Sequence, residues 1–389
     1  MGEFVKQHLI DPEICIRCGA CEAACPIGAI EHDERNVVVK ADACNFCMSC
    51  IPVCPTGSID NWRIVATPYT LADQYDWDEL PAQAAAAQED AVEATDATVA
   101  ALLAEAHAGA EGASRPPVTA ARPTVNLYTP GKPIEATVQG NYRLTAESSG
   151  ADVRHIILNF EGPFPVLEGQ TLGVLAPGED GRLHAPRLYS VSSPRDGERP
   201  GFCNVSITVK REPGGICSNY VCDLGKGDKV KIAGPFGATF LMPDDPQARL
   251  LMICTGTGAA PFRAFTMRRQ RVGPRGGDMT LFFGARAPDS LPYFGPLNKI
   301  ANRVLRKHLV YSRIPGAPKE YVQDRLRVES EEIAELLGDS RTHVYICGLR
   351  GMEAGVEQAF VNIAESVGVS WSAMRDAMRE DGRYHIETY

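Results

Sequence analysis

Eight of the chain's thirteen cysteines lie within residues 15–54, in two runs of the same spacing, C-x2-C-x2-C-x3-C-P. The first run contains Cys15, Cys18, Cys21 and Cys25, and the second contains Cys44, Cys47, Cys50 and Cys54. Two-residue gaps let a turn direct successive thiolates at one face of a cuboidal iron-sulfur cluster, and the fourth cysteine of such a run ligates the other cluster. The spacing therefore predicts two [4Fe-4S] clusters, one held by Cys15, Cys18, Cys21 and Cys54 and the other by Cys44, Cys47, Cys50 and Cys25.

Zinc sites and disulfides are the alternatives for these cysteines. Zinc closes with four ligands in pairs and does not require a doubled three-plus-one pattern with trailing prolines. Disulfide frameworks are typical of small secreted proteins, and this chain has 389 residues. The other five cysteines are scattered, and we expect them to be reduced thiols: Cys203, Cys217, Cys222, Cys254 and Cys347. Residues 8–60 resemble the bacterial-type two-cluster ferredoxins, which implies one-electron transfer at low potential.

Charge and hydropathy exclude several classes of partner. The formal net charge is -10, with the acidic excess concentrated in the first third of the chain, which argues against binding to nucleic acid. No apolar run approaches the ~20 residues of a membrane-spanning helix, so we expect no membrane association. The N-terminus lacks the apolar core of a secretory signal, which predicts a cytoplasmic protein. The sequence does not decide between a monomer and a homodimer.

Changes in sequence pattern divide the chain into four segments. The cysteine-rich head, residues 1–65, is expected to be a small α+β ferredoxin-like domain, and residues 66–124, rich in Ala, Pro and acids, are expected to be a partly helical linker. Short β-branched stretches between Gly and Pro turns predict an antiparallel β-barrel over 125–245. Apolar strands alternating with helical segments predict a doubly wound α/β domain over 246–389.

The barrel segment carries a cation, an aromatic ring and a hydroxyl in the string Arg187-Leu188-Tyr189-Ser190. By itself this string could be an ordinary strand. It is joined by Gly214-Gly215 and Ser218, whose backbone and hydroxyl donors suit a diphosphate.

With these motifs, the chain from about Pro133 to Tyr389 resembles the plastid-like branch of the ferredoxin-NADP reductase family. The resemblance implies bound FAD, with Arg187 at its diphosphate, Tyr189 stacked on the flavin and Ser190 beside the reactive ring nitrogen. It places further FAD contacts at Leu188, Thr208, Val209, Lys210, Ile216, Cys217 and Ser218. Family members often have a tyrosine shortly after the lysine to stack on adenine, but Arg211 and Glu212 follow Lys210 here, which leaves the adenine contact open.

The α/β segment contains the glycine turn CTGTGAAPFR, residues 254–263, between an apolar strand and a helical stretch. Such a turn brings backbone amides close to a diphosphate at a helix N-terminus, which makes Thr257 a candidate contact for the nicotinamide cofactor. By resemblance, Ala285 and Arg286 form a second cofactor turn. Ser312, Arg313, Lys319 and Tyr321 resemble the family's site for the 2'-phosphate of NADPH; the alternative is a solvated loop.

The last candidates lie at strand ends near the C-terminus. Cys347-Gly348-Leu349 resembles the family's motif beside the nicotinamide, and the resemblance places Glu387 in the hydride-transfer site. It also implies that Tyr389 covers the flavin until nicotinamide displaces it, whereas a terminal tyrosine is ordinarily frayed surface. The candidate catalytic residues are Ser190, Cys347, Glu387 and Tyr389.

A hydride carries two electrons and an iron-sulfur cluster accepts one, so a flavin is needed between them. We therefore predict an NADPH-dependent FAD oxidoreductase that passes electrons through its clusters to a separate acceptor. The module order resembles the reductase components of benzoyl-CoA 2,3-epoxidase systems, which implies a di-iron oxygenase partner acting on benzoyl-CoA in aerobic benzoate degradation. The alternatives are a fused ferredoxin-NADP reductase that makes NADPH or supplies another acceptor, and a flavin scaffold for an electron-carrying head.

Overall fold

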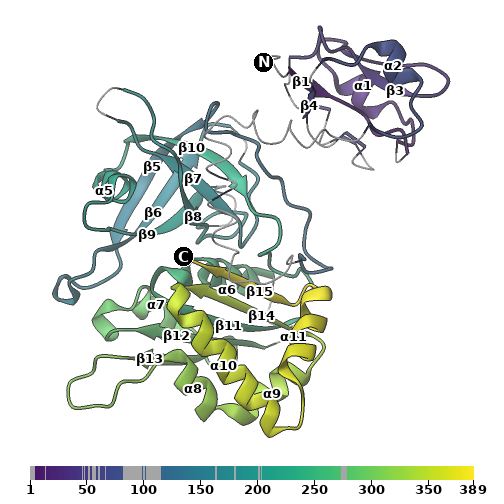
Figure 1. Cartoon of the computed structure of the whole chain (residues 1–389). Coiled ribbons are helices and arrows are strands. Elements are labelled where there is room, and N and C mark those ends of the chain that lie inside the picture. Colours follow the sequence, from purple (N-terminus) through teal and green to yellow (C-terminus); the bar gives the residue numbers. More distant parts are fainter. Residues whose placement is uncertain are drawn as a thin grey trace. The chain divides into compact units, whose positions relative to one another are not determined.

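The computed structural model divides the chain into two compact units, Met1–Ala94 and Thr95–Tyr389, which are described separately (Figure 1). The residues it describes are 5–13, 15–45, 47, 49–50, 53–54, 58–59, 62–65, 67–81, 99, 101, 115–162, 164–178, 181–199, 202, 204–272 and 278–389. None of the helices within these ranges is long and apolar enough to cross a membrane.

The described residues of the head form two small antiparallel strand pairs and two short helices, as expected for an α+β domain. Strand β1 (Val5–His8) pairs with β4 (Trp62–Val65), and β2 (Ile30–His32) pairs with β3 (Val37–Val39). The helices are α1 (Ala20–Ala24) and α2 (Leu71–Tyr75). Its small core combines aliphatic residues with cysteines: Ile10, Cys21, Ile30, Val37, Val39, Cys50, Cys54 and Ile59. Cysteines that belong to the core of so small a domain make its packing depend on what they bind.

Helix α2 packs on the head through buried amide side chains. The Asn36 side chain donates hydrogen bonds to the carbonyls of Gln74, Tyr75 and Trp77, at 3.1, 3.2 and 2.7 Å. The Gln74 side chain bonds both the N–H and the carbonyl of Val39, at 3.1 and 3.0 Å. The head therefore extends beyond the predicted boundary at residue 65, because these amides tie residues 74–77 to β3 and to the turn before it.

The predicted linker over 66–124 is also too long at its other end. Gln170 donates a hydrogen bond of 2.9 Å to the carbonyl of Thr124, and Asp244 N–H donates one of 3.2 Å to the carbonyl of Thr119. Residues 119–124 are thus bonded to Gln170, just before β7, and to Asp244, after β10. The predicted helical part of the linker, which begins after Pro81, lies outside the described residues.

The first domain of the second unit is an antiparallel sheet that closes into a barrel. Its order is β8-β7-β10-β5-β6-β9, from the strands β5 (Ile134–Arg143), β6 (Val153–Phe160), β7 (Thr171–Leu175), β8 (Arg187–Ser190), β9 (Val205–Lys210) and β10 (Lys229–Phe236). A bridge between Val191 and Ile207 joins the two edge strands. Helix α5 (Ile216–Asp223) contributes Cys217, Val221 and Cys222 to the barrel core. The predicted barrel is therefore present, with α5 following β9.

The second domain is a parallel sheet in the order β13-β12-β11-β14-β15. The strands are β11 (Arg249–Thr255), β12 (Met279–Ala285), β13 (Arg306–Tyr311), β14 (Thr342–Gly348) and β15 (Tyr384–Thr388). The helices are α6 (Ala259–Val272), α7 (Phe294–Lys299), α8 (Val322–Val328), α9 (Ser330–Gly338), α10 (Arg350–Ser366) and α11 (Trp371–Glu380). Short 3-10 turns span Glu147–Ser149 (η1), Gly256–Gly258 (η2) and Pro288–Ser290 (η3).

Both faces of this sheet are buried, which explains why its strands are nearly continuous apolar runs. Along β11, Leu251 and Ile253 join a core with α8 to α11, whereas Leu250 and Met252 join a core with α6. The strand order reverses direction between β11 and β14, and ligands of such sheets bind beyond the carboxyl ends of the strands at that point. We therefore expect a ligand to bind beside the residues that follow Thr255.

Candidate functional site

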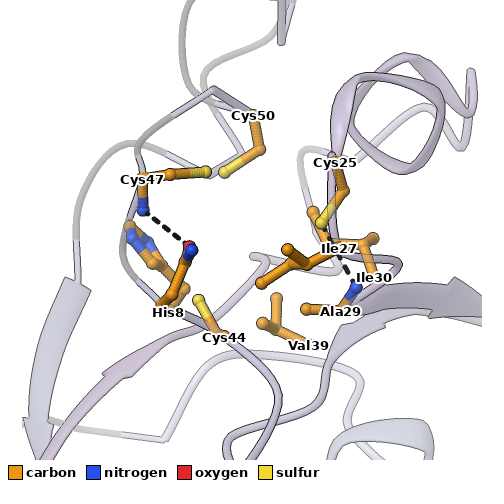
Figure 2. Close-up of a pocket in the computed structure, with 10 residues that line it drawn as sticks. His8, Cys25, Ile27, Ala29, Ile30, Val39, Cys44, Cys47 and Cys50 are labelled. Carbon is orange, nitrogen blue, oxygen red and sulfur yellow. Dashed lines mark hydrogen bonds between the residues drawn. The ribbon is translucent and has the colours of Figure 1, made fainter.

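Four cysteines of the head surround one cavity, shown in Figure 2. The cavity is lined by Cys25, Cys44, Cys47 and Cys50, the set predicted for the second cluster. Cys25 follows α1, and its sulfur accepts a hydrogen bond of 3.2 Å from the N–H of Ala29. The fourth cysteine of the first run thus lies with the first three of the second run, as a crossed ligand pattern requires.

Three of the remaining four cysteines, Cys15, Cys21 and Cys54, also lie near one another. Burial raises the pKa of the Cys21 thiol, and the charges of Cys15 and Cys54 raise it further, which places both close to Cys21. Burial likewise raises the pKa of Cys50 to about 11. Cys15, Cys18, Cys21, Cys25 and Cys50 are free thiols in the described structure, so the disulfide alternative fails for these five. Donor sets made only of cysteine sulfur fit iron-sulfur clusters, since a coordinated metal stabilises the thiolate that burial disfavours.

Strand β8 holds the predicted flavin residues next to the first turn of α5. Tyr189 packs against the barrel core, where burial raises its pKa and the neighbouring Cys217 adds to the shift. The charge of Arg187 in turn lowers the pKa of Cys217 against the larger effect of burial, so Arg187 also lies close to α5. Ser190 ends the strand and is half-buried.

The turn before α5 has the glycine-rich backbone expected at a diphosphate. Gly214 has a φ of +72°, and a Cβ on Gly215 would lie 2.5 Å from Ser218 Oγ. The Ser218 hydroxyl accepts a hydrogen bond of 3.1 Å from the N–H of Glu212. Ile216 begins α5 and its side chain is largely exposed, while Lys210 pairs with Glu212. This cradle fits a bound dinucleotide phosphate, with Arg187 as the nearby cation.

Three predicted FAD contacts have their side chains engaged elsewhere. The Thr208 hydroxyl hydrogen-bonds the Tyr293 hydroxyl at 2.6 Å, and Val209 is fully buried in the barrel core. The Cys217 thiol donates a hydrogen bond of 3.5 Å to the carbonyl of Val174. These residues can offer only backbone atoms to a cofactor. The guanidinium of Arg211 is also occupied, by Asp152, Asn219 and Asp223.

The glycine turn after β11 and the end of β14 are in tight contact. A Cβ on Gly258 would lie 2.2 Å from the carbonyl oxygen of Cys347, and one on Gly348 would lie 2.6 Å from Thr255 Oγ1. The N–H of Leu349 donates a hydrogen bond of 3.3 Å to that same hydroxyl. Only glycine fits these two positions, so the two turns form one continuous surface at the carboxyl edge of the sheet.

The chain's last residues complete this edge. Glu387 lies opposite Cys347 on adjacent parallel strands, and both are buried. The Tyr389 N–H donates a hydrogen bond of 3.0 Å to the carbonyl of Gly348, and its hydroxyl contacts that of Thr257. Burial raises the pKa of Glu387 to about 7 and raises that of the Cys347 thiol. The structure therefore brings Thr257, Cys347, Gly348, Glu387 and Tyr389 together. Figure 1 shows the C-terminus at the edge of the sheet nearest the barrel.

Two of the predicted 2'-phosphate residues, Ser312 and Arg313, follow β13 and bond the residues at the end of β12. Ser312 N–H donates to the carbonyl of Ala285 at 3.1 Å, and Arg313 N–H donates to that of Arg286 at 2.7 Å. Arg286, Arg313 and Lys319 are exposed, and none of them forms an ion pair with a residue in the described ranges. Tyr321 is half-exposed at the start of α8. The unpaired Arg286 and Arg313 beside the Ser312 hydroxyl suit a phosphate dianion, and the Tyr321 ring suits an adenine.

The sequence did not single out a buried polar cluster between the barrel and the parallel sheet. It contains His155, Glu198, Arg263 and Tyr293, of which only Arg263 belongs to a recognised motif. The others are single polar residues far apart in the chain. The only sequence signal is a histidine at the start of the apolar strand His155-Ile-Ile-Leu.

Comparison with known proteins agrees with this geometry. Residues 252–358 match the "Oxidoreductase NAD-binding domain" family, and residues 14–58 match the "4Fe-4S dicluster domain" family. The cyanelle ferredoxin-NADP reductase of Cyanophora paradoxa is 37% identical over 286 residues, which cover 68% of this chain and 79% of that protein. Leaf isozyme 1 of the chloroplastic ferredoxin-NADP reductase of Oryza sativa subsp. japonica is 35% identical over 285 residues, covering 68% and 79%.

Solved structures give the same relationship. The ferredoxin-NADP+ reductase of Plasmodium falciparum matches 69% of this chain and 100% of its own, with a TM-score of 0.57 at 25% identity. The structure of that enzyme with 2'P-AMP matches 68% and 99%, with a TM-score of 0.56 at 25% identity. The chain therefore belongs to the ferredoxin-NADP reductase family, as an NAD(P)-dependent FAD oxidoreductase with a 4Fe-4S domain fused at its N-terminal side.

Proposed function

We propose that this protein takes electrons from NADPH and delivers them through FAD and two [4Fe-4S] clusters to a separate oxygenase. The observation that carries the proposal is that one chain joins the strand-end edge of Cys347 and Glu387 to a head in which Cys25, Cys44, Cys47 and Cys50 line one cavity. When bound, FAD takes up two electrons as a hydride and can release them singly to iron-sulfur clusters.

The edge formed by Thr257, Cys347, Gly348 and Glu387 would hold the nicotinamide. The glycine contacts between the two turns leave backbone groups close to that surface. With a pKa of about 7, the buried Glu387 carboxyl holds a proton for part of the time near neutral pH, so it can donate or accept a hydrogen bond. Tyr389 covers this surface and would move aside for the ring, while Ser190 would lie beside the reactive nitrogen of the flavin.

Selectivity for NADPH would come from the cationic site around Ser312. Arg313 and Lys319 supply charge, Ser312 supplies a hydroxyl, and Tyr321 offers a ring for adenine. The related Plasmodium falciparum enzyme, at 25% identity, is known with 2'P-AMP. That likeness supports a 2'-phosphate site in this family member.

The head would replace the separate ferredoxin after which the relatives are named. Those relatives match only 68% of this chain, and the cysteine-rich residues 14–58 match a different family. Since the ferredoxin-like part is covalently attached, the next acceptor is a further protein. The resemblance of the module order points to the di-iron oxygenase of a benzoyl-CoA 2,3-epoxidase system.

The test begins with anaerobic titration of the purified holoprotein with NADPH. Bleaching of the flavin, appearance of reduced-cluster EPR signals and about eight irons per chain are expected for two cubane clusters. The oxygenase component and benzoyl-CoA are then added in air, and NADPH consumption should rise only when both are present. NADPH consumption that ignores benzoyl-CoA would reject this oxygenase as the acceptor, while loss of flavin reduction would reject the reductase assignment itself.

The family name favours a second candidate, a fused ferredoxin-NADP reductase that runs toward NADPH. The midpoint potentials of the clusters separate the two directions. Clusters well below the NADP+/NADPH couple would favour NADPH formation, and clusters near or above it would favour delivery to the oxygenase.

A further inference from the structure

A buried polar joint connects the barrel to the parallel-sheet domain. The barrel supplies His155 on β6, Ser206 and Thr208 on β9, and Ser192 and Glu198 from the connection between β8 and β9; the other domain supplies Arg263 on α6 and Tyr293 before α7. We call this set the joint.

Its centre is a paired and almost buried carboxylate. Arg263 binds Glu198 with two parallel hydrogen bonds of 2.8 and 2.9 Å. His155 Nε2 lies 3.1 Å from the same carboxylate, and the Ser206 hydroxyl donates to it. Burial by itself would raise the pKa of Glu198, but the bonds from His155 and Arg263 hold this pKa far below its usual value. Glu198 is therefore an acceptor only.

This fixes the hydrogen positions through the rest of the joint. His155 Nε2 faces the Glu198 carboxylate, so this nitrogen must carry a hydrogen. Burial lowers the pKa of the His155 ring, so the ring is neutral and its Nδ1 is an acceptor. The Tyr293 hydroxyl then donates to Nδ1 over 2.9 Å, and it accepts from the Thr208 hydroxyl over 2.6 Å. Each of these polar groups has a hydrogen-bond partner in the joint. Because a fully bonded buried network permits one arrangement of its groups, the joint fixes how the two domains meet.

Tyr293 also adopts a backbone conformation that side chains avoid. Its φ is +61°, in the left-handed region. The ring is held by the two hydroxyl contacts and by the Arg263 guanidinium, whose carbon lies 5.1 Å from the ring centre. A strained backbone conformation of this kind is kept only where many surrounding contacts hold the residue, and such residues are common at functional sites.

The joint lies a few residues from both halves of the reaction site. The Arg263 guanidinium donates a hydrogen bond of 2.7 Å to the carbonyl of Ser192, two residues after Ser190. Arg263 itself lies one helical turn after the Thr257 turn that opens α6. Further along α6, the Arg271 guanidinium donates hydrogen bonds of 2.6 and 2.7 Å to Asp196 and to the carbonyl of Gly197 in the same connection.

We propose that Arg263 and Tyr293 are positioning residues that set the nicotinamide turn against the end of β8, so that hydride transfer depends on the joint. The proposal rests on the chain's activity as an NADPH-FAD oxidoreductase. It requires neither residue to touch the cofactors. Its signature is a loss in the rate of flavin reduction without an equal loss in nucleotide binding.

The test compares Arg263→Gln with Arg249→Gln as a matched control. Arg249 is also a largely buried arginine with several carboxylate partners, Asp278, Glu335 and Asp339, but it lies at the opposite end of β11. Four quantities are measured on the holoprotein: FAD content, melting temperature, Kd for NADP+ and the rate of flavin reduction at saturating NADPH. Arg263→Gln should slow flavin reduction on the order of 10- to 100-fold, with Kd changed by less than about threefold.

The control, Arg249→Gln, should have a lower melting temperature than the natural protein but an unchanged rate of flavin reduction. Arg263→Lys, which retains a charge but not the paired geometry, should recover part of the rate. Equal rates in Arg263→Gln and Arg249→Gln would overturn the proposal, as would a loss of rate matched by a loss of NADP+ affinity.

Tyr293→Phe provides a second test of the proposal if Arg263→Gln does not fold. It retains the ring under Arg263 and removes only the hydroxyl between His155 and Thr208. We expect slower flavin reduction at unchanged FAD content and unchanged Kd, and unchanged flavin reduction would refute the positioning role. Nitrogen NMR of labelled histidine should in addition find His155 neutral with its hydrogen on Nε2; a charged ring would refute the hydrogen-bond order given above.

Discussion

Cys347 and Glu387 are in-register neighbours on β14 and β15, and the carboxyl of Glu387 is buried beside the thiol at the carboxyl edge of the sheet. Glu387 Oε2 accepts no hydrogen bond from any residue in the described ranges. A carboxyl placed this way is less stable when charged, which is why burial raises its pKa to about 7.

The raised pKa of Glu387 predicts a pH-dependent loss of stability. Between its ordinary pKa of 4.5 and about 7 the folded state retains the proton that the unfolded state has released, so stability falls as pH rises through this window. The full loss is about 3 kcal/mol. Glu387→Gln, neutral throughout, should lack it. Urea unfolding of both proteins at pH 5 and pH 8 checks this, and parallel pH profiles would show that Glu387 is not the group responsible.

Arg313→Ala should lower the efficiency of NADPH but not that of NADH. Losing a charge-assisted contact to a phosphate costs about 1.5–3 kcal/mol, which corresponds to a loss on the order of 10- to 100-fold in kcat/KM. Steady-state kinetics with both nucleotides provide the measurement. Arg327→Ala is a suitable control, because Arg327 lies on α8 and pairs with Asp324. Equal losses with both nucleotides would refute the 2'-phosphate site.

Tyr389→Ser should strengthen NADP+ binding and improve the use of NADH. Removing the ring uncovers the surface that nicotinamide would occupy, and an aromatic contact of this kind is worth about 2- to 10-fold in binding. Tyr389→Phe keeps the ring but loses the hydroxyl contact with Thr257, so it should resemble the natural protein. Titration with NADP+ and kinetics with NADH measure both effects. If Tyr389→Ser matched the natural protein in both assays, the terminal tyrosine would be ordinary surface.

Two serines of the head would allow the two proposed clusters to be distinguished. The Ser58 hydroxyl lies 3.2 Å from the sulfur of Cys54, and the Ser49 hydroxyl lies 3.4 Å from that of Cys47. A metal-bound thiolate can only accept, so each serine would donate and raise the potential of its own cluster. Ser58→Ala and Ser49→Ala should therefore lower different midpoint potentials by tens of millivolts in EPR-monitored titrations. A shift of the same transition in both variants would contradict the crossed assignment of the cysteines.

Features encoded by short spacings could be predicted from the sequence. The doubled cysteine runs, the glycine turn before α6 and the string around Tyr189 are local patterns, and a few residues of backbone decide where their groups point. The boundary of the head was predicted too early, because it depends on Asn36 bonding the carbonyls of Gln74, Tyr75 and Trp77. A hydrogen bond across some forty residues leaves no local pattern.

By itself, therefore, the sequence determined the kinds of chemistry this protein carries: thiolates in cluster spacing, a flavin string and a dinucleotide turn. Only the tertiary structure decided which of these groups meet. It turned the Thr208 hydroxyl toward Tyr293, placed Glu387 against Cys347, and assembled a joint around Glu198 from separate segments of the chain. The physical reason is that burial and pairing of polar groups arise from packing between distant elements, which no local spacing specifies.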